Sequence, residues 1–84
     1  MQLSQQAQSI VSDILEHTVL PVPGPHGLDG TQIIAGQGWG SYKQLKAQES
    51  PVASEIEGAV FEAFVAKGNP REQIQGVLNL INAK

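Results

Sequence analysis

Apolar residues recur at intervals of three and four in three parts of the chain, which predicts three amphipathic helices. They cover about residues 3–17, 51–67 and 70–83. In each segment the polar side chains fall mostly on the opposite face, so we expect the apolar stripes to pack into one core. The stripe of the central helix consists of Val52, Ile56, Ala59, Val60, Ala63 and Phe64, with Phe61 and Val65 beside it.

Start and stop signals are clearest in the C-terminal half. Ser50 is a good N-cap and Pro51 suits the first helical position, where a missing N–H costs nothing. Gly68 can end that helix in the left-handed conformation. The sequence NPRE that follows, with Asn69 as the capping residue, predicts a capping box for the last helix. Because the turn between the two helices is so short, residues 50–83 are predicted to form a helical hairpin.

Residues 20–30 interrupt this pattern with three prolines and three glycines, which excludes a helix or a central strand. The segment is either an ordered crossing, fixed to the core by Val22 and Leu28, or a mobile loop. We favour the ordered crossing because long structureless loops are uncommon in compact domains. Just before it, Thr18 and Val19 favour extended geometry.

Residues 31–42 allow two interpretations. A helical turn over 31–35 followed by a glycine-rich loop is favoured, since isolated hairpins are marginal in water. The alternative is a small hairpin that pairs TQIIA with WGSY across GQG. Beyond this segment, Ser41 and Gln44 fit a capping box and predict a short helix over about 42–49.

Together these elements predict a single all-α domain over residues 1–84, a small bundle of three to four helices. It would have a C-terminal helical hairpin and a long Pro/Gly-rich connection, the loop 20–40. At this length one core is only just sufficient, and a second subunit is a common supplement. The apolar arc of the central helix is broader than one neighbour covers, which is compatible with a homodimer.

Charge and composition narrow the function classes. The net charge is −3 and cysteine is absent, which excludes disulfides and thiolate metal sites. The basic residues form no stripe that would neutralise several phosphates, which argues against nucleic acid. A nucleic-acid-binding helical regulator remains an alternative, and it would use Lys43, Lys46, Lys67 and Arg71. No signal-peptide pattern and no apolar run of about 18 residues occurs, so we expect a cytoplasmic protein without membrane contact.

The residues with catalytic or metal-binding chemistry are few. His17, His26 and Asp29 match no metal-ligand spacing, and helix-end and turn roles are the favoured interpretation. The segment GQGWGS satisfies neither of the glycine patterns that bind phosphate. The sequence therefore predicts no catalytic residue, no cofactor and no metal site, and we expect a protein that is not an enzyme.

Ser41 follows a long loop and is expected to open a helix with Tyr42 and Leu45. Over GSYKQL alone, the chain resembles acyl and peptidyl carrier proteins around their attachment serine. Those families place Asp or His before the serine and Leu or Ile after it, whereas Gly40 and Tyr42 flank Ser41 here. An N-cap is therefore the favoured role, and a carrier-like or small-ligand-binding domain remains an alternative.

Trp39 lies between two glycines, and it either closes the core or serves as an exposed recognition anchor. The core role is favoured, and the two roles can coexist.

By elimination, we predict a small non-enzymatic protein–protein interaction module, such as an adaptor, inhibitor or regulatory subunit of a bacterium or phage. The residues predicted to bind the protein partner are Trp39, Tyr42, Ile33, Ile34, Phe61 and Val65.

Overall fold

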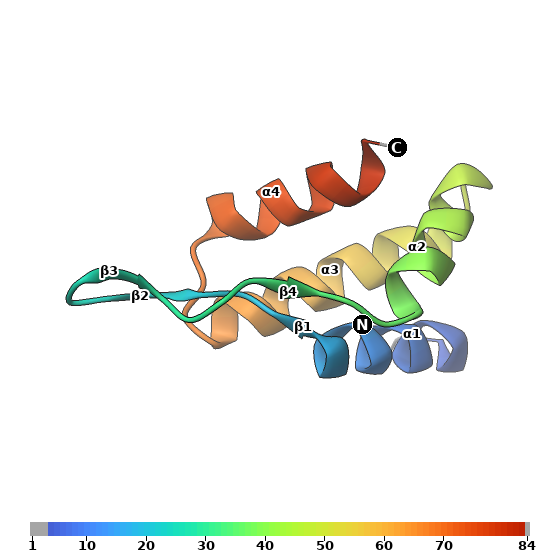
Figure 1. Cartoon of the computed structure of the whole chain (residues 1–84). Helices are drawn as coiled ribbons and strands as arrows, with labels where there is room; N and C mark the ends of the chain where they lie inside the picture. The colour runs from blue at the N-terminus through green and yellow to red at the C-terminus, as the bar shows by residue number, and fades with distance from the viewer. Residues whose placement is uncertain (1–3, 84) are drawn as a thin grey trace.

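Figure 1 shows the computed structural model of the chain, which describes residues 4–83. This part of the chain is mostly helical, so the predicted all-α fold class is confirmed. The helices are α1 (Gln5–His17), α2 (Gly38–Ala47), α3 (Pro51–Ala66) and α4 (Arg71–Asn82). Between α1 and α2 lie four short strands, β1 (Thr18–Val19), β2 (Val22–Gly24), β3 (Gly27–Asp29) and β4 (Ile33–Ile34).

Helix α3 is the centre of the fold, because α1, α2 and α4 all pack against it. It buries four residues of its apolar face, and these join residues of the other helices in one core. None of the helices within residues 4–83 combines the length and the apolar character needed to cross a bilayer. The buried apolar residues are Ala7, Val11, Ile14, Leu20, Trp39, Tyr42, Ala53, Ile56, Val60, Phe64, Ile74, Val77 and Leu78.

The three amphipathic helices lie close to their predicted positions. Helix α1 begins after Ser4, whose hydroxyl accepts from the amide of Ala7 at 3.2 Å; residue 3, the predicted start, lies outside the described part. Ser50 caps α3 as expected and accepts from the amide of Val52 at 3.2 Å. At the other end, Gly68 is left-handed with φ of 100°, which lets the chain turn sharply into α4.

Helix α2 begins four residues before the predicted position, and it includes Gly38 and Gly40. The predicted capping box is wrong: Ser41 lies inside the helix, and Gln37 at the N-cap position makes no side-chain capping bond. Instead, Asp13 on α1 accepts from the amide of Gly38 at 2.5 Å. This carboxylate satisfies a free donor at the positive end of α2, so a contact distant in sequence starts the helix.

The other end of α2 also differs from the prediction. The helix stops at Ala47, two residues before the predicted end. Glu49 takes a left-handed φ of 58°, and the amide of Ser50 bonds to the carbonyl of Leu45 at 3.0 Å. This is the hydrogen-bond pattern that commonly ends helices at glycine, here formed at a glutamate.

Residues 18–34 form a β-hairpin in place of the predicted loop. At its base, β1 pairs antiparallel with β4, with Thr18 opposite Ile34 and Val19 opposite Ile33. Nearer the tip, β2 pairs antiparallel with β3. Both interpretations of residues 31–42 are therefore wrong. Ile33 and Ile34 form a strand rather than a helical turn, and that strand pairs with β1, while the sequence WGSY is part of α2. Prolines are tolerated because each strand of a two-stranded ribbon has a free edge.

The hairpin extends away from the helices, and its tip reaches beyond the ends of α3 and α4 (Figure 1). Val22 was expected to fix this segment to the core, but 38% of its surface is exposed. The side chain of Leu28, its expected counterpart, lies outside the described part. We call residues 18–34 the arm.

Candidate functional site

The six residues predicted to bind a partner lie in three separate places. Trp39 and Tyr42 are buried in the core, with 5% and 0% of their surfaces exposed. Ile33 and Ile34 lie on the arm, where Ile33 is 47% exposed and Ile34 packs partly against the core. The last two, Phe61 and Val65, lie on α3, half-buried and 36% exposed respectively. The structure therefore offers two accessible surfaces, the arm and one side of α3.

Trp39 connects the helices to the base of the arm. Its indole N–H donates to the hydroxyl of Thr18 at 2.8 Å, in a buried hydrogen bond between α2 and β1. Its ring meets that of Tyr42 edge to face, with 5.9 Å between the centroids. Such aromatic pairs are favourable beyond the area they bury. Trp39 thus closes the core, which was the favoured interpretation, and it also fixes β1.

Asn69 holds the base of the arm from the other side. It is 4% exposed, and its amide nitrogen lies 3.5 Å from the carbonyl of Leu20 and 3.1 Å from that of Pro21. Gln73 on α4 accepts from the same nitrogen and donates to the carbonyl of Pro21, both at 2.9 Å. The predicted capping role of Asn69 is wrong, because Pro70 takes the N-cap position and makes no side-chain capping bond.

The arm displays apolar side chains with almost no charge around them. Val19, Val22 and Ile33 are three of the five large apolar side chains that are exposed among the described residues. Val19 and Ile33 are cross-strand partners, so their side chains stand on the same face of the ribbon. Residues 18–37 contain no lysine, arginine or glutamate. Natural proteins usually protect free strand edges with such charges, so this surface is open to association.

The two strands of the arm differ in their capacity to pair. The first strand and the turn carry Pro21, Pro23 and Pro25, which have no N–H to donate. Residues 27–36 contain no proline and keep every backbone donor. In its sheet, β4 pairs with β1 alone, so its other edge carries no strand. The arm is therefore blocked on one edge and able to accept a strand on the other.

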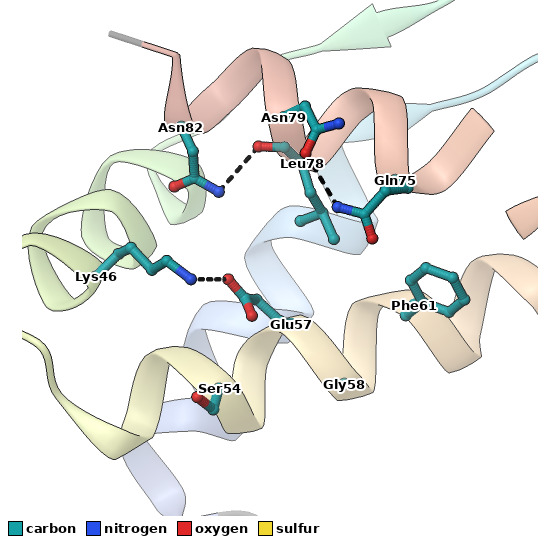
Figure 2. Close-up of a pocket in the computed structure, with 9 residues that line it drawn as sticks. All are labelled: Lys46, Ser54, Glu57, Gly58, Phe61, Gln75, Leu78, Asn79 and Asn82. Atoms are coloured by element: carbon teal, nitrogen blue, oxygen red, sulfur yellow. Dashed lines mark hydrogen bonds and ion pairs between the residues drawn. The ribbon is translucent and has the colours of Figure 1, made fainter. Parts of the chain in front are cut away.

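The second surface is a groove between α3 and α4, whose polar part is shown in Figure 2. Gly58 leaves the groove open, since a Cβ built there would have no atom within 4 Å. A neighbouring hollow of about 440 Å³ shares Gly58 and Phe61 and is more apolar, with Val65 and Arg71 at its rim. The polar part, of about 510 Å³, is lined by Lys46, Ser54, Glu57, Gly58, Phe61, Gln75, Leu78, Asn79 and Asn82.

A hydrogen-bond network closes one end of this groove and links three helices. The hydroxyl of Tyr42 on α2 donates to Glu57 on α3 and accepts from the amide of Asn82 on α4 at 2.9 Å. Lys46 donates to the same carboxylate oxygen at 2.8 Å (Figure 2). Partial burial alone would raise the pKa of Glu57, but the bonds from Lys46 and Tyr42 outweigh it and lower the pKa. Glu57 is therefore a fixed carboxylate and a poor proton acceptor.

The same network predicts an unusual alkaline titration. Burial, together with the bond to Glu57, raises the pKa of Tyr42 to about 12 from 10.0, while Asn82 opposes the rise. Since the fold favours the neutral phenol, this contribution to stability is complete below pH 10 and is lost as pH rises to about 12. As the chain has one tyrosine, its tyrosinate absorbance should appear near pH 12 when folded and near pH 10 in denaturant. A titration midpoint near pH 10 in the folded protein would contradict this network. Tyr42→Phe, which has no tyrosine, gives the background absorbance.

The residues considered for other chemistry are dispersed. The Nδ1 atom of His17 lies 3.0 Å from the carbonyl oxygen of Asp13 and 3.3 Å from its carboxylate, at the end of α1. His26 is exposed at the tip of the arm, and the side chain of Asp29 lies outside the described part. Among the side chains that the structure describes, no three histidine or acidic ones lie close enough to hold a metal ion. Ser41, the carrier-like serine, is half-buried inside α2.

Two residues that fix the arm and α2 in place, Asn69 and Asp13, were not predicted to do so from the sequence. Asn69 followed by proline fits a helix cap equally well, and nothing local indicates that its amide bonds to Leu20 and Pro21. Asp13 is one of the polar residues of the first helix, and nothing next to it in the sequence indicates that it caps α2.

The chain matches no protein-family model, no curated protein and no solved structure at a significant level.

Proposed function

We propose that this protein is a non-enzymatic protein–protein interaction module, an adaptor or regulatory subunit, and that the arm is its contact element. The observation that carries this proposal is the contrast between the base and the surface of the arm. The base is held by buried hydrogen bonds from Trp39 and Asn69. The surface displays Val19, Val22 and Ile33 to solvent. A segment needed only to connect two helices has no reason to combine these features.

The fixed base favours binding because it reduces the entropy lost on association. A contact element that is already ordered loses less conformational freedom than a flexible loop when a partner binds. The bonds to Thr18, Leu20 and Pro21 hold the first strand against α2, the turn after α3 and the start of α4. Pairing with β4 then orders the second strand. The arm is thus presented to a partner as a preformed ribbon.

Strand addition is the binding mode that fits this ribbon. An extended segment of the partner would pair with the proline-free strand, residues 27–36, through backbone hydrogen bonds. The adjacent pair of Val19 and Ile33 would receive an apolar side chain of that segment on one face. The low charge of residues 18–37 favours a partner segment that is apolar and uncharged.

Site-specific photo-crosslinking tests the proposal. A benzophenone amino acid at Val22 or at Ile33 should form an adduct with one defined protein in host cells. The same group at Val65, which is also exposed but lies on α3, serves as the matched control and should give no adduct with that protein. Adding Val19→Asp should abolish the adduct at Ile33 while the helical circular dichroism is unchanged. Equal labelling from Val65 and Ile33, or no protein adduct from the arm, would contradict the assignment.

A further inference from the structure

A separate hollow lies between α2 and the C-terminal half of α4. Its volume is about 320 Å³, and it is lined mostly by apolar groups. Trp39, Gly40 and Lys43 line it from α2, and Leu80 and Ile81 line it from α4. Leu80 points away from the main stripe of its helix and is 55% exposed, more than any other large apolar side chain described. None of the exposed apolar residues of the arm lines this hollow.

Lys43 lines this hollow, and none of the described side chains forms an ion pair with it. Within residues 4–83, the other lysine and arginine side chains are engaged: Lys46 pairs with Glu57, and Lys67 and Arg71 lie over phenylalanine rings. Lys43 makes neither kind of contact with the described residues, although it is half-buried beside Trp39. Lysine side chains at such places commonly lay their aliphatic stem along apolar surface and keep the ammonium group in water, where an anion can reach it.

We propose that this hollow binds a small amphiphilic carboxylate. Its aliphatic tail would lie against Trp39, Leu80 and Ile81, and its carboxylate would pair with the ammonium group of Lys43. We choose this ligand class for its charge complementarity, because an unpaired cation beside an apolar wall favours a ligand that has both an anionic head and an apolar tail. The volume is at the low end for ligand pockets, which favours a short tail. This site is independent of the proposed function of the arm.

Gly40 provides a way to block the hollow. A Cβ built at Gly40 would have no atom within 4 Å, so a larger side chain there meets open space rather than the core. Because Gly40 lies within α2, most replacements also improve its helix propensity. Gly40→Leu should therefore fill the hollow without unfolding the protein. Gly58→Leu is the matched control, because Gly58 is another open helical glycine that does not line this hollow.

The experiment follows the indole N–H resonance of Trp39, the single tryptophan of the chain, during titration with octanoate. We expect a saturable shift with a Kd on the order of 1 mM. Acetate has no tail and octylammonium has the opposite charge, so neither should saturate this shift. Lys43→Gln should weaken octanoate binding about fivefold, the effect of losing one partly exposed ion pair. Lys67→Gln should leave the Kd unchanged, and Gly40→Leu should abolish the shift while Gly58→Leu retains it.

Several outcomes would overturn the proposal. Octylammonium binding as tightly as octanoate would show that Lys43 does not select the ligand. The absence of a saturable shift up to about 20 mM octanoate would show that the hollow does not bind such a carboxylate. Saturable binding of an acidic apolar peptide without octanoate binding would make the hollow a protein contact instead. If Gly40→Leu fails to fold, Leu80→Gln replaces it, and unchanged octanoate affinity in that variant would equally overturn the assignment.

Discussion

Replacing Gly38 with alanine should lower the free energy of unfolding by about 2–3 kcal/mol, because the new methyl group has no space. A Cβ there would lie 2.7 Å from Cγ1 of Ile14 and 2.9 Å from the carbonyl oxygen of Ile10. The second contact is with backbone, which cannot rotate away, so α2 must move from α1. That movement would also break the bond from the Gly38 amide to Asp13.

The matched control is the same substitution at Gly58, where a Cβ meets nothing within 4 Å. Gly58→Ala should raise the free energy of unfolding by about 0.5–1 kcal/mol, because alanine loses less backbone entropy in a helix. For a domain of this size, the melting temperatures of the two variants should differ by roughly 15 °C. Denaturant unfolding followed by circular dichroism checks both. Equal stability of the two variants would show that α1 and α2 do not approach each other as closely as described.

Asn69→Ala should lower the free energy of unfolding by about 2 kcal/mol, although it lies in a turn where most substitutions are neutral. The substitution removes the donor to the carbonyls of Leu20 and Pro21 and to the side chain of Gln73. Asn69 is almost fully buried, so water cannot readily replace its amide. The melting temperature should therefore fall by about 10 °C.

Asn79→Ala is the control for this prediction. Asn79 also accepts a hydrogen bond, from Gln75 at 3.1 Å, but both residues are exposed on one face of α4. A surface pair of this kind contributes about 0.2–0.5 kcal/mol. Similar small losses from the two alanine variants would mean that Asn69 does not hold the arm.

Local chemistry was sufficient to predict the long helices. The start of α3 is signalled by Ser50, its N-cap, and by Pro51, its first residue. Its end is signalled by Gly68, which takes the left-handed conformation. The apolar stripe with Ile56 and Phe64 gives the buried face directly, since burial follows helical periodicity. Each of these signals acts over a few residues, and each was read correctly from the sequence.

The start of α2 could not be predicted in the same way. Its first turn contains Gly38 and Gly40, which lower helix propensity, and its capping carboxylate comes from Asp13 on another helix. Gly38 is present because α1 passes too close for any side chain. Tertiary contacts therefore override the local preference, and only the arrangement of α1 against α2 reveals why.

The hairpin of the arm could not be predicted because of its amino-acid composition. Thr18 and Val19 were expected to be extended, and Ile33 and Ile34 are β-branched, but thirteen residues rich in proline and glycine separate Val19 from its partner Ile33. Pairing over that separation leaves no periodic signal. Ile33, one of the residues predicted to bind a partner, is exposed, whereas Val19 was not predicted to be a surface residue and Val22 was expected against the core.

Nuclear magnetic resonance of the full chain tests whether residues 18–34 form an ordered hairpin that is fixed to the helices. The structure predicts cross-strand nuclear Overhauser effects between Val19 and Ile33. It also predicts contacts from the indole N–H of Trp39 to Thr18, and backbone order at the base of the arm equal to that of α3. Random-coil shifts and sharp, unprotected amide signals throughout residues 20–34 would contradict an ordered hairpin, and the proposed contact element would then have no fixed structure.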